Sequence, residues 1–223
     1  MRSSYFFKQL FGACIFFSLL FISAGRINYW QGWIYVALGI FMIILNYTLF
    51  SVDDELLKER SKPGPDAKPW DKTILGLSFL IMLAMFVTAG LDSGRYHWSP
   101  EFPLAATVLG AVLTATGQLL FLIAQKQNKF FSSTVRIQQD RGHVVCDSGL
   151  YGFVRHPAYL GSFIQALGFP LLFGSLYSII PVSLTLMLLI TRTALEDRTL
   201  RNELIGYEAY SHKVRFRLMP KIW

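Results

Sequence analysis

The sequence predicts an all-α, polytopic integral membrane protein with six spans, and three observations support this prediction. Hydrophobic residues make up 53% of the 223 residues and the mean hydropathy is positive at +0.41, which is more apolar than a soluble domain requires. The apolar residues form blocks of about 20, the length with which an α-helix crosses the hydrocarbon core of a bilayer. The basic residues lie between these blocks rather than inside them.

Four spans are expected before the longest polar region, over residues 6–24, 30–50, 73–91 and 103–124. The first two follow one another closely and should form a helical hairpin. The charged segment 53–72 separates the second span from the third. Because Pro63, Pro65 and Pro69 break any helix that begins at Asp54, we expect a surface loop there. The polar region 125–155 follows the fourth span, and polar connections of this length are often functional.

Residues 157–191 contain no charged side chain and no histidine. As one helix they would measure ~53 Å at 1.5 Å per residue, too long for one crossing. Gly168, Pro170 and Gly174 lie near the middle, so we expect two spans, 157–173 and 176–192, that form a tight helical hairpin. Charges mixed with leucine and tyrosine over 193–223 predict an additional amphipathic C-terminal helix at the membrane interface. The chain then divides into a four-span membrane region, 1–124, and a C-terminal region, 125–223, that carries the chemistry.

The positions of the basic residues predict the orientation. With six spans, all but Arg26 and Arg95 of the 21 Lys and Arg residues fall on the side that holds both termini. The positive-inside rule makes that side cytoplasmic. The corresponding membrane would be the bacterial inner membrane in a prokaryote or the endoplasmic reticulum in a eukaryote.

Composition argues against two other classes of partner. The formal net charge of +7 comes from segments that flank spans and not from a basic face with interleaved aromatic residues, so no nucleic-acid partner is expected. Cys14 and Cys146 form no C-x-x-C pair, so neither a metal site nor a disulfide framework is expected.

The sharpest local motif is Arg155-His156-Pro157-Ala158-Tyr159. Proline suits the first position of a helix, and the free N–H groups at a helix start favour a bound anion. Alone, however, the two basic residues fit a plain membrane boundary equally well. Arg192 and Glu196 are four residues apart on one helix face, a spacing that a simple ion pair also explains.

The order of the motifs along the chain is more specific than any one of them. Gly149-Leu150-Tyr151, the Arg-His-Pro-x-Tyr-x-Gly run, an uncharged hairpin, Glu196-Asp197 and Tyr207-x-x-Tyr210-x-x-x-Val214 follow one another over about 136–220. This order resembles the isoprenylcysteine carboxyl methyltransferase family, in particular its bacterial-type branch, which is related to the phospholipid methyltransferases.

The resemblance implies S-adenosyl-L-methionine as cofactor, in a cytoplasm-facing pocket, and a lipophilic or prenylated acceptor that enters from the membrane lipid. Arg192 falls at the position of a substrate-facing arginine and, with Glu196, is assigned to catalysis. The cofactor-binding residues that carry over by position are Gln138, His143, Val144, Val145, Cys146, Tyr151, His156, Pro157, Ala158, Tyr159 and Glu196.

The expected activity is carboxyl O-methylation of an isoprenylcysteine-like substrate, and three alternatives stay open. The first two keep the cofactor and change the acceptor, to a phospholipid amine or a small thiol. An amine acceptor favours a nearby carboxylate over an arginine, so replacing Arg192 would distinguish it. The third alternative is a non-enzymatic membrane transporter or assembly factor. A transporter would carry ionisable residues inside its spans, where this sequence has almost none.

Overall fold

The computed structural model describes residues 2–50, 53–62 and 66–223, and over these residues it is helical and contains no strand. α4 continues into a π-helical turn, η1, and two short 3₁₀ helices, η2 and η3, lie in the loop between α5 and α6. The elements in chain order are α1 (Arg2–Ala24), α2 (Trp30–Thr48), α3 (Asp54–Ser61), α4 (Pro69–Ala89), η1 (Gly90–Tyr96), α5 (Leu104–Gln127), η2 (Gln139–Arg141), η3 (Gly149–Gly152), α6 (Pro157–Phe173), α7 (Ile179–Glu203) and α8 (Tyr207–Lys213).

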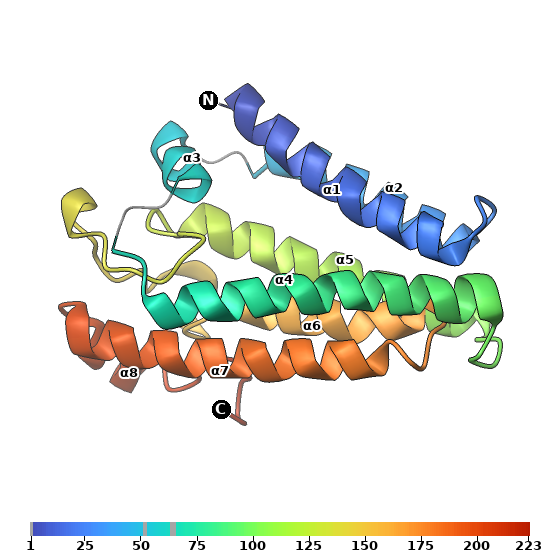
Figure 1. Ribbon diagram of the computed structural model, residues 1–223. Helices are drawn as coiled ribbons and strands as arrows, with labels where there is room; N and C mark the ends of the chain where they lie inside the picture. Colours follow the sequence, from blue (N-terminus) through green and yellow to red (C-terminus); the bar gives the residue numbers. More distant parts are fainter. Residues whose placement is uncertain (1, 51–52, 63–65) are drawn as a thin grey trace.

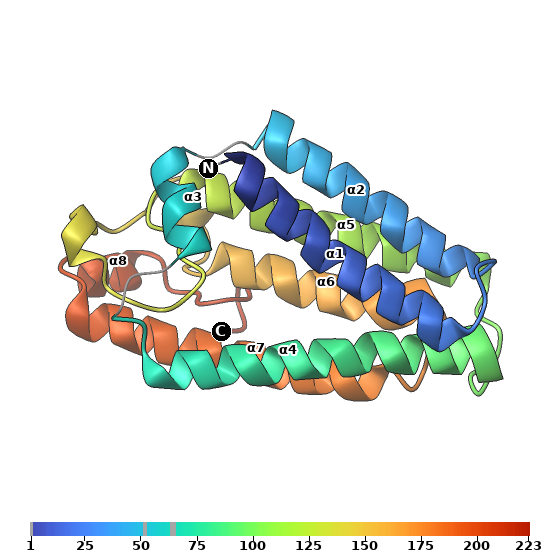
Figure 2. The ribbon, with the colours of Figure 1, turned by 45° about the horizontal axis from the view of Figure 1, so that its top comes forward.

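The long helices lie lengthwise beside one another in a single bundle (Figures 1 and 2). In both views α3, α8 and the loop between α5 and α6 gather at one end, which we call the loop end. The short connections α1 to α2, η1 to α5 and α6 to α7 lie at the opposite end. The polar segments that the sequence separates widely are therefore neighbours in space.

Over the described parts of the chain, five helical segments are long and apolar enough to cross a membrane: α1, α2, α4 with η1, α5 and α7. α6 is also apolar but has 17 residues. All six apolar segments predicted from the sequence are thus helices, which confirms a polytopic integral membrane protein. The core where they meet is largely aromatic, and Tyr29, Phe86 and Phe173 are fully buried in it.

The predicted hairpin of α6 and α7 is confirmed, with a different boundary at its far end. α6 ends at Gly174, whose φ of 64° is a conformation that glycine adopts readily and that commonly ends helices. α7 does not stop at residue 192 but runs on to Glu203. No glycine or proline interrupts 182–205, so the first part of the expected interfacial helix continues α7. Only α8 is a separate C-terminal helix.

The segment 53–72 is not the helix-free loop that its prolines predicted. Asp53 caps α3 by accepting a hydrogen bond of 2.7 Å from the Leu56 N–H, a common stabilising arrangement at helix starts. Leu56 and Leu57 are buried against Tyr5 of α1. α3 ends at Ser61, and Pro63 and Pro65 lie outside the described residues. A cap and two buried leucines are therefore enough for a helix of two turns.

α5 and α6 approach so closely that their glycines form the contact. A Cβ at Gly117 would lie 2.3 Å from the Gly161 carbonyl oxygen, and a Cβ at Gly110 would lie 2.2 Å from the Leu172 nitrogen. Small residues at helix contacts allow such backbone approach in membranes. This contact fixes the start of α6 against the end of α5, where the loop between them closes.

At the end opposite the loop end, the carboxylate of Asp92 joins η1 to the turn between α6 and α7. Asp92 is fully buried and accepts hydrogen bonds from the Ser99 N–H at 2.7 Å, from the Ser99 hydroxyl at 2.6 Å and from the Ser175 hydroxyl at 2.6 Å. Buried polar groups require such partners. One side chain therefore holds two connections of the bundle together.

We expect Asp92→Ala to lower the free energy of unfolding by about 3 kcal/mol, because it leaves several buried donors without an acceptor. Thermal unfolding of the detergent-purified variant measures this effect. Glu101→Ala, which removes an exposed carboxylate from the same end, is the control and should unfold like the wild type. Equal unfolding of both variants would show that the Asp92 contacts contribute little.

Candidate active site

A cavity at the loop end brings together the segments that the sequence motifs singled out. It encloses about 1090 Å³ including its open mouth, which is large enough for a cofactor-sized ligand. Its walls come from the loop between α5 and α6, the first turn of α6, α7 and α8. The predicted site residues that line this loop-end cavity are Gln138, His143, Val144, Val145, Cys146, Tyr151, His156, Ala158, Tyr159, Arg192 and Glu196. Pro157 does not line it and is instead the first residue of α6.

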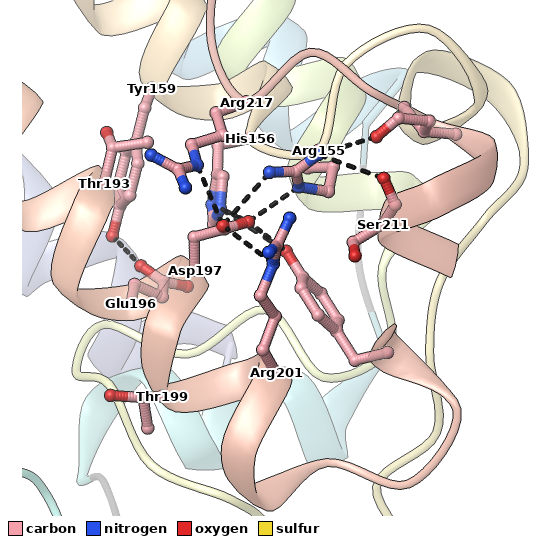
Figure 3. A network of polar contacts seen from close by, with 12 residues as sticks. Arg155, His156, Tyr159, Thr193, Glu196, Asp197, Thr199, Arg201, Ser211 and Arg217 are labelled. Atoms are coloured by element: carbon pink, nitrogen blue, oxygen red, sulfur yellow. Dashed lines mark hydrogen bonds and ion pairs between the residues drawn. The ribbon is translucent and has the colours of Figure 1, made fainter. Parts of the chain in front are cut away.

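Asp197 lies at the centre of a network of polar contacts with several arginines (Figure 3). It accepts hydrogen bonds from Arg155 Nε at 2.6 Å and Nη2 at 3.0 Å, from Arg217 Nε at 2.9 Å and from the Tyr207 hydroxyl at 3.1 Å. The side chains of Arg155 and Asp197 are both 1% exposed. Asp197 therefore neutralises the Arg155 guanidinium, which acts inside the protein as an ion-pair partner.

The same network attaches the end of the chain to the start of α6. Arg155 Nη1 donates to the carbonyls of Val214 at 2.7 Å and Arg215 at 2.9 Å. The backbone N–H of Arg155 donates to the Phe216 carbonyl, and that of His156 to the Arg217 carbonyl, both at 2.9 Å. The C-terminal segment after α8 is thus held against the start of α6.

Two N–H groups at the start of α6 remain available to a ligand. Pro157 has none, and those of Ala158 and Tyr159 have no acceptor outside α6 among the described residues. A helix supplies no internal acceptor for its first turn, so both groups are unpaired beside the cavity. The anion site at the start of α6 stays a prediction, with these two backbone N–H groups as its donors.

Tyr159, Glu196 and His156 form a second polar cluster in the cavity wall. The Tyr159 hydroxyl donates to Glu196 Oε2 at 2.5 Å, and Figure 3 shows the two side chains facing each other. The other carboxylate oxygen of Glu196 accepts no hydrogen bond within the described part of the chain. The His156 ring lies parallel to the Tyr159 ring with centroids 5.7 Å apart. A carboxylate with one free oxygen therefore lies next to aromatic rings.

Arg192 is held by an acidic residue that the sequence analysis missed. Its Nε donates to Asp71 Oδ1 at 2.7 Å and its Nη2 to Asp71 Oδ2 at 3.3 Å, while Nη2 also donates to the Ser133 carbonyl. Asp71, at the start of α4, is fully buried and also accepts from the Val135 N–H. Nη1 of Arg192 has no hydrogen-bond partner among the described residues. The guanidinium is thus fixed at one edge and free at the other.

The loop between α5 and α6 lines the cavity with Gln138 and residues 143–146. Both ends of the Gln138 side-chain amide are engaged by the protein, because Nε2 donates to the Phe130 carbonyl at 2.6 Å and Oε1 accepts from Arg141 Nη1. The backbone N–H groups of Val144, Val145 and Cys146 make no hydrogen bond within the described residues. Gln138 therefore shapes the loop, and the next turn of chain offers free peptide groups.

His143 is held neutral in this loop. Burial in the cavity wall and, to a smaller degree, the nearby cations Arg136 and Arg141 lower the pKa of His143 from 6.5 to about 4. Its Nδ1 accepts a hydrogen bond of 3.3 Å from the Gln138 N–H, which only an unprotonated ring nitrogen can do. The loop therefore contributes no histidine charge near neutral pH.

The lowered pKa of His143 predicts the direction of a pH effect. The unfolded state takes up a proton near pH 6.5 and the folded state only near pH 4, so His143 contributes stability above pH 6.5 that is lost as the pH falls from 6.5 to 4. NMR titration of ¹³C-labelled histidine rings should find one ring with a pKa near 4, and His143→Gln should remove that signal. A His143 ring that titrates near 6.5 would contradict this arrangement.

Among the described residues, no group of three or more His, Cys, Asp or Glu side chains is placed to hold a metal ion. Cys14 and Cys146 are free thiols, and burial raises the pKa of the Cys146 thiol. The walls of the cavity present arginines, a carboxylate and aromatic rings.

Comparison with known proteins identifies relatives of this part of the chain. Residues 108–202 match the isoprenylcysteine carboxyl methyltransferase (ICMT) family, which confirms the resemblance. The protein-S-isoprenylcysteine O-methyltransferase of Schizosaccharomyces pombe is 34% identical over 101 residues, 44% of this chain and 43% of that protein. The protein of the same name from Saccharomyces cerevisiae is 34% identical over 93 residues, 41% and 37% of the two chains. The match thus spans less than half the length of these curated relatives.

Proposed function

We propose that this protein transfers a methyl group from S-adenosyl-L-methionine to the carboxylate of a lipophilic, isoprenylcysteine-like acceptor. The proposal proceeds from the match of residues 108–202 to the isoprenylcysteine carboxyl methyltransferase family. The observation that carries the proposal is the loop-end cavity. Four segments from 138 to 196 meet there, and they are the segments in which the sequence resembles the family.

The groups that line the cavity fit the chemistry of the proposed cofactor. Its carboxylate suits the unpaired N–H groups of Ala158 and Tyr159. The free oxygen of Glu196 can accept a hydrogen bond from a ribose hydroxyl, and the faces of Tyr151 and Tyr159 suit a sulfonium cation. The free peptide groups of 144–146 suit the edge of an adenine ring. We propose that Gln138 and His143 shape this part of the site and that His156 and Pro157 position the start of α6.

Arg192 is proposed as the residue that binds the acceptor. Asp71 fixes the Nε edge of its guanidinium, and Nη1 is free to donate to a carboxylate. The cofactor supplies, when bound, a methyl group on a sulfonium sulfur, which a carboxylate attacks without prior deprotonation. The contribution of the protein is then to align the acceptor and exclude water, which lowers the barrier through proximity and desolvation.

We also propose that the loop end is cytoplasmic and that both termini lie on that side. Arg26 and Arg95 are the two basic residues that do not fall on the predicted cytoplasmic side. Arg26 follows α1 and Arg95 lies in η1, and both segments lie at the end of the bundle opposite the loop end. The positive-inside rule supports this orientation.

The proposed reaction is tested with the purified protein in phosphatidylcholine nanodiscs and S-adenosylmethionine that carries a tritiated methyl group. The acceptors are N-acetyl-S-farnesylcysteine, its methyl ester, phosphatidylethanolamine and dodecanethiol. We expect label only in the free acid and in a form that mild base releases, as a methyl ester requires. Label in the amine or the thiol would assign a different acceptor, and no label in any of them would contradict the proposed reaction.

A further inference from the structure

A second cavity of about 1060 Å³ including its mouth lies within the bundle, between α1, α2 and α5. We call it the membrane cavity. It reaches from Lys8, near the loop end of α1, past Gly12 to Phe16 and Tyr35. Its near part is polar, with Lys8, Gln9 and Arg60, and its far part is mainly apolar and aromatic with the two polar residues Thr114 and Gln165. A cavity with this gradient suits an amphiphile whose chain points into the bundle.

The membrane cavity meets the loop-end cavity at Arg60 and Phe121, which line both. Arg60 lies on α3, and its guanidinium contacts the rings of Phe121 and Phe131 with centroid distances of 5.9 and 5.0 Å. Its Nε donates to the Tyr5 hydroxyl at 3.1 Å. A cation is thus held by aromatic groups at the junction of the two spaces.

Arg60 also differs in charge balance from the other arginines around the loop-end cavity. Arg136 pairs with Glu59 and Asp140, Arg155 with Asp197, and Arg192 with Asp71. Within the described part of the chain, Arg60 has no carboxylate at ion-pair distance, and no acidic residue lines the membrane cavity. Arg60 is therefore the arginine whose charge the protein leaves to be balanced by a ligand.

Polar atoms buried around the membrane cavity also lack partners. Gln125 and Thr114 are 2% and 3% exposed, yet among the residues that the structure describes Gln125 Nε2, Thr114 Oγ1 and Gln9 Oε1 have no hydrogen-bond partner. All three residues line the cavity. Leaving such buried atoms unpaired is unfavourable, and a ligand with carbonyl or amide groups next to its chain would supply the missing partners.

From these observations we propose that the membrane cavity binds an anionic single-chain amphiphile, with the chain between α1, α2 and α5 and the carboxylate on Arg60. This inference rests on the proposed function in one respect, which is that this amphiphile is the methyl acceptor. Its carboxylate would then lie at the junction through which it reaches the loop-end cavity and Arg192.

The test measures equilibrium binding of tritiated N-acetyl-S-farnesylcysteine and of its neutral methyl ester, in phosphatidylcholine nanodiscs without S-adenosylmethionine. We expect the wild type to bind the acid at least tenfold more tightly than the ester. Arg60→Ala should remove this preference by weakening the binding of the acid roughly ten- to hundredfold, the loss expected for a charge-assisted hydrogen bond. Arg60→Lys should restore part of the preference for the acid. Equal binding of acid and ester by the wild type would overturn the assignment of Arg60.

A pair of glycine variants tests the position of the chain. A Cβ at Gly12 meets no atom within 4 Å, and Gly12 lines the membrane cavity. Gly12→Phe should therefore fill this cavity and weaken the binding of both the acid and the ester. Gly76, on α4, is equally uncrowded but lines neither cavity, and Gly76→Phe is the matched control. Unchanged probe binding in Gly12→Phe would overturn the proposed site.

Two further results separate this proposal from the proposed function. Calorimetric binding of S-adenosylmethionine should be unchanged in Gly12→Phe, because Gly12 does not line the loop-end cavity. If the amphiphile binds as expected but no S-adenosylmethionine binds, the site stands and the methyltransferase proposal fails. If phosphatidylglycerol in the nanodisc displaces the acid, the cavity belongs to a resident lipid and the acceptor assignment is overturned.

Discussion

Asp197→Ala is expected to lower the free energy of unfolding by about 3–5 kcal/mol, because it leaves the buried guanidinium of Arg155 without its counter-charge. Arg155 and Asp197 are each 1% exposed, and Arg217 and Tyr207 bind the same carboxylate. The segment after α8 would lose its attachment to α6, and Arg155 and His156, which line the loop-end cavity, would lose their shared carboxylate partner. Binding of S-adenosylmethionine should fall together with stability.

Thermal and denaturant unfolding in detergent measure the effect of Asp197→Ala. The control is Asp147→Ala, since Asp147 and Lys213 lie 3.9 Å apart with side chains 58% and 74% exposed, and exposed ion pairs contribute about 0–1 kcal/mol. Asp197→Asn keeps hydrogen-bonding atoms and should fall between the two. If Asp197→Ala unfolds like Asp147→Ala, the network does not support the site.

Gly117→Leu is expected to have the second large effect, a loss of folded protein that corresponds to at least about 3 kcal/mol, because it overpacks a contact that has no room. A Cβ at Gly117 would lie 2.3 Å from the Gly161 carbonyl oxygen and 2.5 Å from the Gln165 nitrogen. Both are backbone atoms, which cannot move without separating α5 from α6. The start of α6, with its free N–H groups, would move with them.

The matched control is Gly76→Leu, which introduces the same side chain at an exposed glycine with no atom within 4 Å of its Cβ. Size-exclusion chromatography and thermal unfolding should show a monodisperse, wild-type-like Gly76→Leu and an aggregated or strongly destabilised Gly117→Leu. Wild-type stability of Gly117→Leu would mean that α5 and α6 do not pack through their glycines as described.

The fold could be predicted from the sequence because hydropathy and helix length act locally. The six apolar segments and the turn at Gly174 follow from runs of residues and from one glycine. The end of α7 could not be predicted from hydropathy, since a helix can continue beyond the membrane until a breaker such as Gly206 stops it. The division of the chain at residues 124 and 125 stays a prediction.

The candidate site was predictable where its residues form a motif along the chain, as at 156–159. It was not predictable where a partner comes from a distant helix. Asp71 lies 121 positions before Arg192, and in the sequence it is one charged residue at a membrane boundary. Arg60 is likewise one of several basic residues of a charged segment, and only the fold brings it to the junction of two cavities.

The central claim, that the loop-end cavity binds S-adenosylmethionine, is tested most directly by isothermal titration calorimetry of the purified protein. We expect saturable binding to the wild type. Glu196→Ala should bind roughly ten- to hundredfold more weakly, because one charge-assisted hydrogen bond is lost. The control Glu208→Ala removes an exposed carboxylate of α8 and should bind with wild-type affinity. Absence of binding in a folded, monodisperse wild-type sample would contradict the claim, and wild-type affinity in Glu196→Ala would contradict the role of Glu196.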